Sequence, residues 1–242
     1  MKLFNKKRLE QIQWSGLKKY TLYAIGEILL VVVGILIALW INNWNQETTA
    51  IKQQRDIALR VMSQLKKDQT NIRKFIDTLE FQSDLFDLLL TERTLSQTEM
   101  KTLHEELPYL VTVQVFILNQ QDETLQILSH NKAIDNPVLK ILESIESDYK
   151  YNLEMLQISE DKMVDEIMGN LNYLKNNKDW YYKLILGYDL TDEEFSYFKS
   201  NDYKNRVAQM ELMSHQGYLS LLYQFEFDIN NHIKELDAIL KE

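Results

Sequence analysis

The sequence predicts an all-α protein: one N-terminal transmembrane helix followed by an antiparallel bundle of three long helices plus short helical connections. An uninterrupted apolar segment covers residues 21–41, and apolar residues recur at helical spacing in three later segments. The 242 residues include only six glycines and two prolines. Few helix breakers favour long helices over a many-stranded sheet.

The apolar segment of residues 21–41 reads TLYAIGEILLVVVGILIALWI, with Glu27 as its single charged side chain. As a helix rising about 1.5 Å per residue, it covers about 30 Å, which matches the hydrocarbon core of a bilayer. It is longer than the apolar part of a signal peptide and lacks a small-residue cleavage site, so we expect an uncleaved signal anchor. Aromatic rings that prefer the headgroup region mark both edges as interface anchors: Tyr20 and Tyr23, then Trp40 and Trp44.

Charge is distributed unevenly along the chain. The net charge is −9, but the first 20 residues carry +5, and residues 28–242 therefore carry −13. Six Lys and Arg residues precede the apolar segment, whereas three follow it closely, so the positive-inside rule places the N-terminus in the cytoplasm. The strongly acidic remainder argues against nucleic acid as a partner.

These observations predict three parts: a basic cytoplasmic tail of residues 1–20, a transmembrane helix of residues 21–41, and an extracytoplasmic helical-bundle domain of residues 42–242. The lipid bilayer is then one partner of the chain. A tail of this length is too short for an output domain, so we expect any signal to pass through a partner protein or an oligomer.

The segment YAIGEILLVVVGILIALWINNWN resembles the N-terminal signature of an uncharacterised family of bacterial single-span membrane proteins. The residues that carry the resemblance are Tyr23, Gly26, Glu27, Asn42, Asn43, Trp44 and Asn45. The later stretch DETLQILSHNKAIDN resembles a helix-and-turn element of the same family more weakly. The resemblance implies a single-pass protein of the bacterial cytoplasmic membrane with a periplasmic domain of unknown function, and it implies no activity.

Three apolar stripes predict the three long helices of the bundle. The first lies in residues 46–92 and uses Ala58, Met62, Leu65, Gln69, Ile72, Ile76, Leu79, Ser83, Phe86 and Leu90. The second follows the cap candidates Asp135 and Asn136 and Pro137, runs to about residue 176, and uses Val138, Leu142, Ile145, Tyr149, Leu153, Leu156, Met163, Ile167, Leu171 and Leu174. The third runs from about Asn201 to the C-terminus and uses Val207, Met210, Ser214, Gly217, Leu221, Phe225, His232, Leu236 and Ile239.

Shorter helices are expected between the long ones. Capping boxes at Ser96–Glu99 and Thr191–Glu194 each predict a helix start. The β-branched stretch of residues 109–118 could form a strand, but a lone strand has no partner for its backbone groups. We therefore interpret it as buried helix or loop.

The motifs of common enzyme classes are missing from the sequence. There is no cysteine, which excludes thiol nucleophiles and disulfides, and the four histidines form no HExxH or Glu-x-x-His pair. No glycine-rich phosphate-binding motif occurs. We therefore expect a protein that is not an enzyme and has no catalytic residues, cofactor or metal site. His232 lies on the third stripe and is interpreted as a structural residue, with Asp228 as its candidate partner.

Two groups of residues outside the stripes are candidate interaction sites. Twelve aromatic residues fall between Trp180 and Phe227, and the patch candidates among them are Trp180, Tyr181, Tyr182 and Tyr188. They could pack as a plug at one end of the bundle or form a binding patch. In the span, Gly26, Gly34 and Ala38 share one helix face that would permit close helix packing. A homo-oligomer through the span and a monomeric span both stay open.

Glu27 allows two interpretations, and they lead to different functions. If Glu27 is a fixed group near the headgroups, it takes no part in transport. The chain is then expected to be a membrane-anchored, non-enzymatic protein that acts in interaction, scaffolding or sensing outside the cytoplasm, with an unknown membrane or extracytoplasmic protein partner. As a protonatable group within the bilayer, it suggests the alternative of a carboxylate-bearing subunit of an oligomeric ion- or proton-conducting membrane complex.

Overall fold

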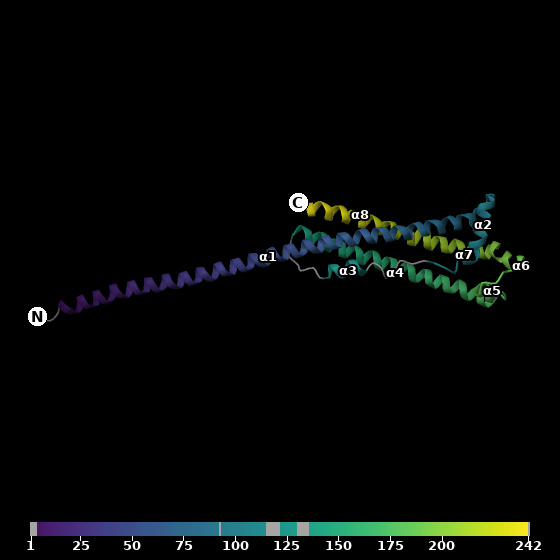
Figure 1. Ribbon diagram of the computed structural model, residues 1–242. Helices are drawn as coiled ribbons and strands as arrows, with labels where there is room; N and C mark the ends of the chain where they lie inside the picture. Colours follow the sequence, from purple (N-terminus) through teal and green to yellow (C-terminus); the bar gives the residue numbers. More distant parts are fainter. Residues whose placement is uncertain (1–3, 92, 115–121, 130–135, 242) are drawn as a thin grey trace. The chain divides into compact units, whose positions relative to one another are not determined.

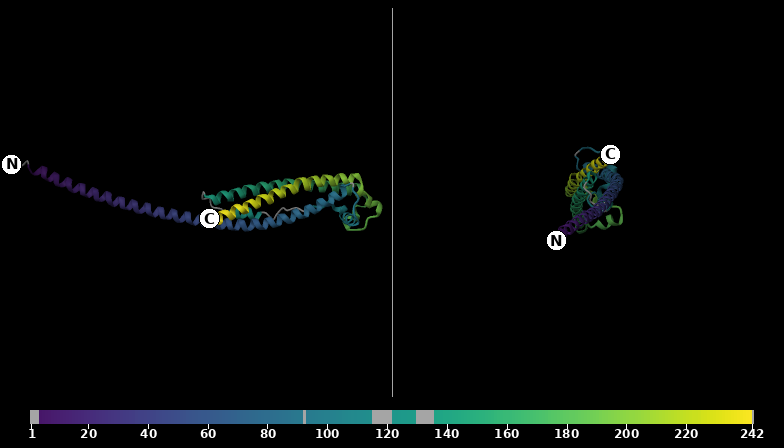
Figure 2. Two further views of the ribbon diagram at one scale, coloured as in Figure 1. Left: turned by 90° about the horizontal axis from the view of Figure 1, so that it is seen from above. Right: turned by 90° about the vertical axis from the view of Figure 1, so that its left-hand side faces the viewer.

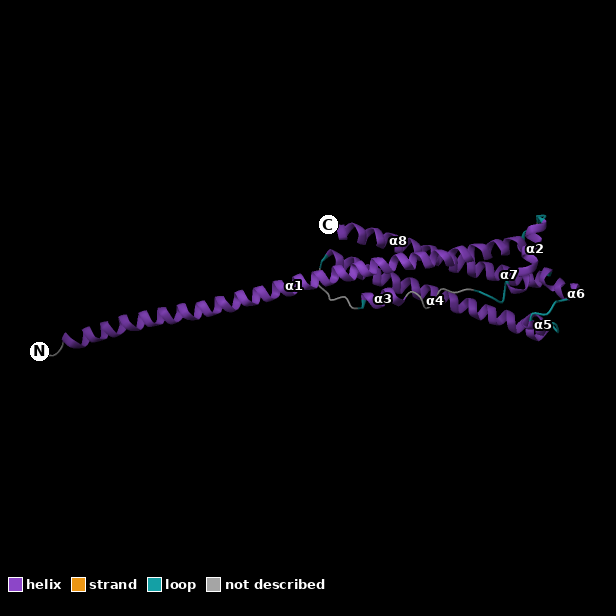
Figure 3. Ribbon diagram, in the orientation of Figure 1, coloured by secondary structure: helices purple, strands orange, loops and turns teal. Residues whose placement is uncertain are grey.

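All regular structure in the described residues is helical (Figure 3). The computed structural model describes residues 4–91, 93–114, 122–129 and 136–241. The all-α fold class is therefore confirmed. The chain divides into two compact units, Met1–Gln53 and Gln54–Glu242, and helix α1, Phe4–Leu90, contributes residues to both.

The first unit consists of the N-terminal part of α1. Among the described residues, α1 is the one helix that is long and apolar enough to cross a membrane, and no side chain of its apolar stretch is buried. All described side chains from Tyr20 to Glu47 are exposed. Trp40 and Trp44 stack one helical turn apart, with ring centroids 6.4 Å apart and planes inclined by 9°. The predicted apolar helix is thus present, and its side chains are free to face a medium other than the protein.

The second unit contains the three predicted long helices. They are the remainder of α1, α4 at Pro137–Asn177, and a third helix built from α7 at Asn201–Glu211, the π-helical segment η3 at Leu212–Leu219, and α8 at Ser220–Lys241. The predicted cap of the second helix is confirmed at Asn136, whose side-chain oxygen accepts a hydrogen bond of 2.9 Å from the Leu139 backbone N–H. The other cap candidate, Asp135, lies outside the described residues.

The third helix runs antiparallel to both others. Arg55, Gln69 and Glu80 of α1 are hydrogen-bonded to Leu240, Asn230 and Tyr223 in turn, so residue numbers fall along α8 as they rise along α1. Likewise, Asn152 and Glu160 of α4 are bonded to Asp228 and Tyr218. The predicted antiparallel packing therefore holds for this helix against each of its neighbours.

Helices α1 and α4 run parallel, a direction that the apolar stripes of the sequence do not predict. Gln54 is bonded to Asn136 at the start of α4, and Asp68 is bonded to Tyr149 farther along it. The chain therefore returns along the bundle between α1 and α4. The described part of this return includes α3, Asp122–Leu128, which packs on α4 and on the middle of the core (Figures 1 and 2).

The π-helical segment shifts the buried face of the third helix. Up to Ser214 the buried positions follow the predicted stripe, but they continue with Tyr218 and Leu222 in place of the predicted Gly217 and Leu221. A π-helix holds one extra residue per wide turn, so the core positions at Tyr218 and Leu222 lie one residue closer to the C-terminus than predicted, whereas the predicted Phe225, His232 and Leu236 are buried. The predicted Gly217, Leu221 and Ile239 are therefore only partly buried, at the edge of the core.

Two hydrophobic clusters form the core. The first fills the length of the bundle with residues of α1, α3, α4, η3 and α8, among them Ile57, Leu65, Ile72, Leu128, Leu142, Leu156, Tyr218, Phe225 and Leu236. The second lies at the end where α1 and α4 finish, and includes Leu85, Phe86, Leu89, Leu103, Leu107, Leu110, Val111, Leu174, Trp180, Tyr197, Phe198, Tyr203, Val207 and Met210. We call this second end of the bundle the tip.

Short helices connect the long ones at the tip. They are α2 at Gln97–Glu106, η1 at Leu107–Tyr109, α5 at Tyr181–Leu186, α6 at Asp192–Phe195 and η2 at Ser196–Lys199. Both predicted capping boxes are confirmed, with reciprocal bonds between Ser96 and Glu99 and between Thr191 and Glu194. In the predicted helix or loop of residues 109–118, the described part is the end of η1 and a turn; residues 115–118 lie outside the described residues.

A carboxyl group lies in the centre of the first cluster. Asp68 of α1 is fully buried, and its oxygens accept hydrogen bonds from Thr124 at 2.7 Å, Tyr149 at 2.9 Å and Gln64 at 3.0 Å. Burial raises the pKa of Asp68, and the three hydrogen bonds offset part of that rise. The ionised form is thus costly in the folded state, although its acceptor positions are satisfied.

Because the pKa of Asp68 is raised on folding, the folded state holds this proton more tightly than the unfolded state. The contribution of Asp68 to the unfolding free energy should therefore fall as pH rises from about 4 through the raised pKa. The variant Asp68→Asn cannot ionise at this position, so its unfolding free energy should not fall for this reason. We predict that the unfolding free energy of the variant, relative to that of the unchanged chain, increases with pH over that window. Urea unfolding of the full chain in detergent across this pH range measures the difference.

The matched control is Asp56→Asn, which changes an exposed carboxyl group on the same helix. Its pH profile should parallel that of the unchanged chain. A parallel profile for Asp68→Asn as well would show that the Asp68 carboxyl does not carry the predicted linkage.

Candidate functional site

The tip is closed by packed aromatic rings. Trp180, Tyr197, Phe198 and Tyr203 are buried, and their ring centroids lie 5.0–5.9 Å apart in the recorded pairs. The tilted and edge-on arrangements are those that aromatic quadrupoles favour. Four of the eight aromatic residues from Trp180 to Tyr203 thus form a core plug.

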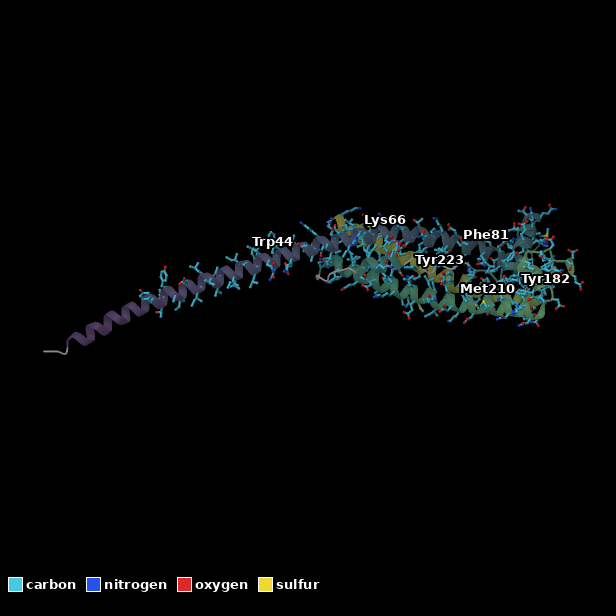
Figure 4. The ribbon with its side chains drawn as sticks, turned by 60° about the horizontal axis from the view of Figure 1, so that its bottom comes forward. Trp44, Lys66, Phe81, Tyr182, Met210 and Tyr223 are labelled. Atoms are coloured by element: carbon cyan, nitrogen blue, oxygen red, sulfur yellow. The ribbon has the colours of Figure 1, made fainter. Side chains whose placement is uncertain are left out.

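The four predicted patch residues separate into two groups. Trp180 belongs to the plug, and Tyr181 packs partly against it. Tyr182 and Tyr188 are 55% and 61% exposed, and Ile185 and Leu186 beside them are exposed to a similar degree. Figure 4 shows Tyr182 at the tip, on the surface of the bundle. An exposed apolar edge thus lies next to the plug, in and just after α5.

The connection from α1 to α2 is held by a network of charge-assisted bonds. Arg93 donates two hydrogen bonds to the Glu99 carboxylate, of 2.7 and 3.2 Å, and the backbone N–H of Ser96 donates a third, of 2.8 Å. These donors lower the pKa of Glu99 to about 2, with the Arg93 hydrogen bonds as the largest cause. At neutral pH the connection is therefore fixed by a fully ionised carboxylate.

Two further contacts hold α2 and η1 against the rest of the tip. The hydroxyl of the buried Tyr203 in α7 donates a hydrogen bond to the backbone carbonyl of Leu107. The ring of His104 in α2 lies over that of Phe195 in α6, with centroids 4.0 Å apart. The segment between α1 and η1 is therefore tied at several points, and its surface is largely formed in advance of any binding event.

These tied segments border an open cavity of about 740 Å³. Its apolar lining comes from the end of α1, α2 and η1, and its charged lining includes three lysines. The apolar lining includes Leu88, Leu89, Met100, Leu103 and Leu107, and the lysines are Lys101, Lys199 and Lys204. This volume lies within the range of about 300–1,000 Å³ for small-molecule sites. We call it the tip cavity.

A second open cavity, of about 710 Å³, is lined by both members of the Arg93–Glu99 pair. It shares Leu88, Thr91 and Arg93 with the tip cavity, but its other charged residues include Asp84 and Asp87. Arg93 therefore borders two cavities, one with Asp84 and Asp87 in its lining and one with three lysines.

The tip cavity was not predicted from the sequence. Its lysines lie in α2, η2 and α7, where no long apolar stripe indicates which side chains share a surface. The Ser96–Glu99 capping box marks the start of α2 and was the available signal. The capping box fixes a helix end, but it does not show that Lys199 and Lys204 line the same cavity as α2.

His232 is buried, as its position on the third stripe predicts, but its predicted partner is wrong. Its Nε2 lies 2.9 Å from Asp148 of α4, and its Nδ1 lies 3.4 Å from Glu235. Asp228 instead accepts hydrogen bonds from Asn152 and Gln224. The nearer partner comes from the neighbouring helix, which a spacing of four residues along one helix cannot show. Across the described part of the chain, no group of three or more His, Asp or Glu side chains could hold a metal ion.

The residues singled out in the span are all exposed. Gly26 and Gly34 have open space where a Cβ atom would stand, and Ala38 lies on the exposed helix as well. Glu27 is exposed, as are the interface anchors Tyr20, Tyr23, Trp40 and Trp44. Close helix packing through the small residues and the role of Glu27 therefore stay predictions.

Comparison of the chain with protein-family profiles, with curated proteins and with solved structures finds no match. The geometry of the tip and the properties of α1 are therefore the features that bear on function.

Arg93→Gln should raise the pKa of Glu99 from about 2 towards its ordinary value of 4.5, because the largest cause of the lowering is removed. The sign follows from linkage: a lowered carboxyl pKa stabilises the folded state above the ordinary value and loses that effect as pH falls towards 2. Acid loosening of the tip should therefore begin at higher pH in this variant. An NMR titration of carboxyl carbons, with Glu99 assigned by Glu99→Gln, measures the shift.

The control is Lys101→Gln, which removes a cation of α2 whose ion-pair partner is Glu105 at 4.0 Å. It should leave the Glu99 titration unchanged. If Glu99 still titrates near 2 in Arg93→Gln, the Arg93 pair does not cause the lowered pKa.

Proposed function

We propose that this chain is a membrane-anchored, non-enzymatic binding module that acts in interaction or sensing outside the cytoplasm. The observation that carries the proposal is the tip cavity, whose walls are tied by the Arg93–Glu99 pair, the Tyr203–Leu107 bond and the His104–Phe195 contact. A preformed cavity loses less conformational entropy on binding than a flexible surface does.

The first helix supports the membrane part of the proposal. Its apolar stretch is exposed around the helix, an arrangement that is unfavourable in water and favourable in a bilayer. The same helix supplies Leu88 and Leu89 to the tip cavity. The resemblance of residues 23–45 to a family of bacterial single-span membrane proteins supports the same assignment to the bacterial cytoplasmic membrane.

The charge distribution supports an orientation with the bundle in the periplasm. Lys and Arg are concentrated before the apolar stretch, and the acidic remainder follows it. In this orientation the tip cavity is available to extracytoplasmic ligands or proteins.

Orientation can be tested by protease added to bacterial spheroplasts that express the full chain. We predict that the domain after Trp44 is digested, whereas the first 20 residues are protected by the membrane. Opening the spheroplasts should then expose the N-terminal peptide as an internal control. Digestion of the domain only after opening would reverse the proposed orientation.

The binding role can be tested by filling the tip cavity. Met100 lines the cavity and is 51% exposed, so Met100→Trp should occupy part of the volume without disturbing the core. We predict that Met100→Trp weakens binding at least about tenfold, a change of about 1.4 kcal/mol, and that less material therefore copurifies with the full chain from native membranes in mild detergent.

Met168→Trp is a matched control, because Met168 is also 51% exposed but lies on α4, away from the cavity. Mass spectrometry of proteins and small molecules in each preparation gives the readout. Equal composition in the unchanged chain and both variants would contradict a binding role for the tip.

The alternative function, a subunit of an ion- or proton-conducting complex, is supported by Glu27, a carboxyl group within the apolar stretch. Glu27→Gln keeps the size of the side chain but cannot ionise. A conducting complex predicts loss of proton flux in vesicles reconstituted with native partners, with assembly unchanged. The binding-module proposal predicts no flux with either chain, and flux that depends on Glu27 would favour the alternative.

A further inference from the structure

The tip cavity combines an apolar floor with a cationic rim, and this combination indicates the class of its ligand. We propose that it binds an amphipathic carboxylate, with the aliphatic chain on the floor and the carboxylate at the lysines of the rim. The inference builds on the proposed binding role and adds the chemistry of what is bound.

The floor belongs to the folded core and is held by it. Leu89, Leu103 and Leu107 line the cavity and are each no more than 7% exposed. They pack in the second core cluster with Phe86, Val111 and Tyr203. These fixed side chains form the base of the cavity, and the apolar surface that water still reaches comes from Met100, which is 51% exposed, and from the half-buried Leu88 and Leu95. Covering that surface with an aliphatic chain removes hydrocarbon from water.

The rim brings together lysines from separate elements. Lys101 comes from α2, Lys199 from η2 and Lys204 from α7, and all three line the same cavity. Lys101 has the carboxylate of Glu105, which also lines the cavity, as a neighbour at 4.0 Å. The Lys199 ammonium lies 5.9 Å from the centroid of the Phe195 ring, a contact that it can keep while it faces an anion, so Lys199 and Lys204 are the cations assigned to the ligand. With −13 carried by residues 28–242, this cationic rim is a local reversal of charge that favours an anionic group.

The arrangement fits a carboxylate on a hydrocarbon chain better than a phosphate. Phosphate sites commonly add backbone N–H groups or an arginine fork to their lysines, because a phosphate presents several charged oxygens at once. Arg93, the arginine that lines the cavity, already donates both of its fork bonds to Glu99. Lysine ammonium groups act as point charges, and a floor of leucine and methionine supplies binding energy only to apolar atoms.

The test uses the full chain in lipid nanodiscs and isothermal titration with octanoate, with empty nanodiscs as the blank. Octan-1-ol has a similar chain without the charge, and acetate has the charge without the chain. We expect saturable binding of octanoate, with octan-1-ol and acetate each at least about tenfold weaker. Two variants separate the parts: Lys199→Gln with Lys204→Gln for the rim, and Met100→Trp for the floor.

Each variant should weaken octanoate binding by at least about tenfold, a size expected from two partly exposed charge pairs or from a filled cavity. The control pair, Lys162→Gln with Lys234→Gln, removes two exposed lysines outside the cavity and should bind as the unchanged chain does. Circular dichroism and thermal unfolding verify that all variants fold alike.

Several results would overturn the proposal. They are octanoate binding that survives both cavity variants, octan-1-ol binding as tightly as octanoate, absence of saturable octanoate binding, and binding of an acidic peptide that octanoate does not displace. A loss of copurifying material in Met100→Trp, together with no octanoate binding, would leave the binding module standing and reject only this ligand class. If octanoate binds but Met100→Trp leaves copurification unchanged, the ligand class is supported and the copurifying partner binds at another part of the chain.

Discussion

The carboxyl group of Asp68 accepts hydrogen bonds from α1, α3 and α4. Sliding one apolar stripe by a helical turn against its neighbour exchanges similar contacts and costs little free energy. Leaving a buried carboxylate without its hydrogen-bond donors costs much more free energy. The parallel run of α1 and α4 depends on a return segment, and Thr124 of that segment is one of the Asp68 donors. Other buried polar contacts follow the same rule, since Glu160 meets Tyr218 and Asn152 meets Asp228 across the α4–α8 pair.

The long helices were predictable because their signals are local. The cap at Asn136 and the capping box at Ser96 need only a few residues, and each leaves its mark in the sequence. The apolar spacing from Ala58 to Phe86 likewise follows from the 3.6-residue period of one helix facing a core.

The interactions between helices were not predictable in the same way. Asp68, Glu160 and Asn170 lie at buried positions, but a polar residue interrupts a stripe without stating its partner. The π-helical turn at Leu212–Leu219 moves the core from Leu221 to Leu222, and the spacing of apolar residues alone fits either phase. The tip cavity depends on Lys101, Lys199 and Lys204 converging from separate elements, and its recognition needs the folded arrangement.

The two units of the chain place different demands on the same helix. In α1, exposed apolar residues surround the helix in the first unit, whereas one buried stripe and charged outer faces characterise the second. The first pattern suits a bilayer and the second suits a water-soluble bundle. In Figure 4, Trp44 lies on the stretch of α1 that precedes the bundle, and Lys66 and Phe81 lie within it.

Spin labels directly test the proposal that α1 lies in the bilayer along its apolar stretch and in water along the bundle. The chain has no cysteine, so Leu36→Cys and Thr49→Cys each give a single label at an exposed position without further changes. In reconstituted bilayers, collision with oxygen should dominate for the label at position 36, and collision with a water-soluble nickel complex should dominate for the label at position 49. Equal access of the nickel complex to both labels would contradict the membrane assignment of α1.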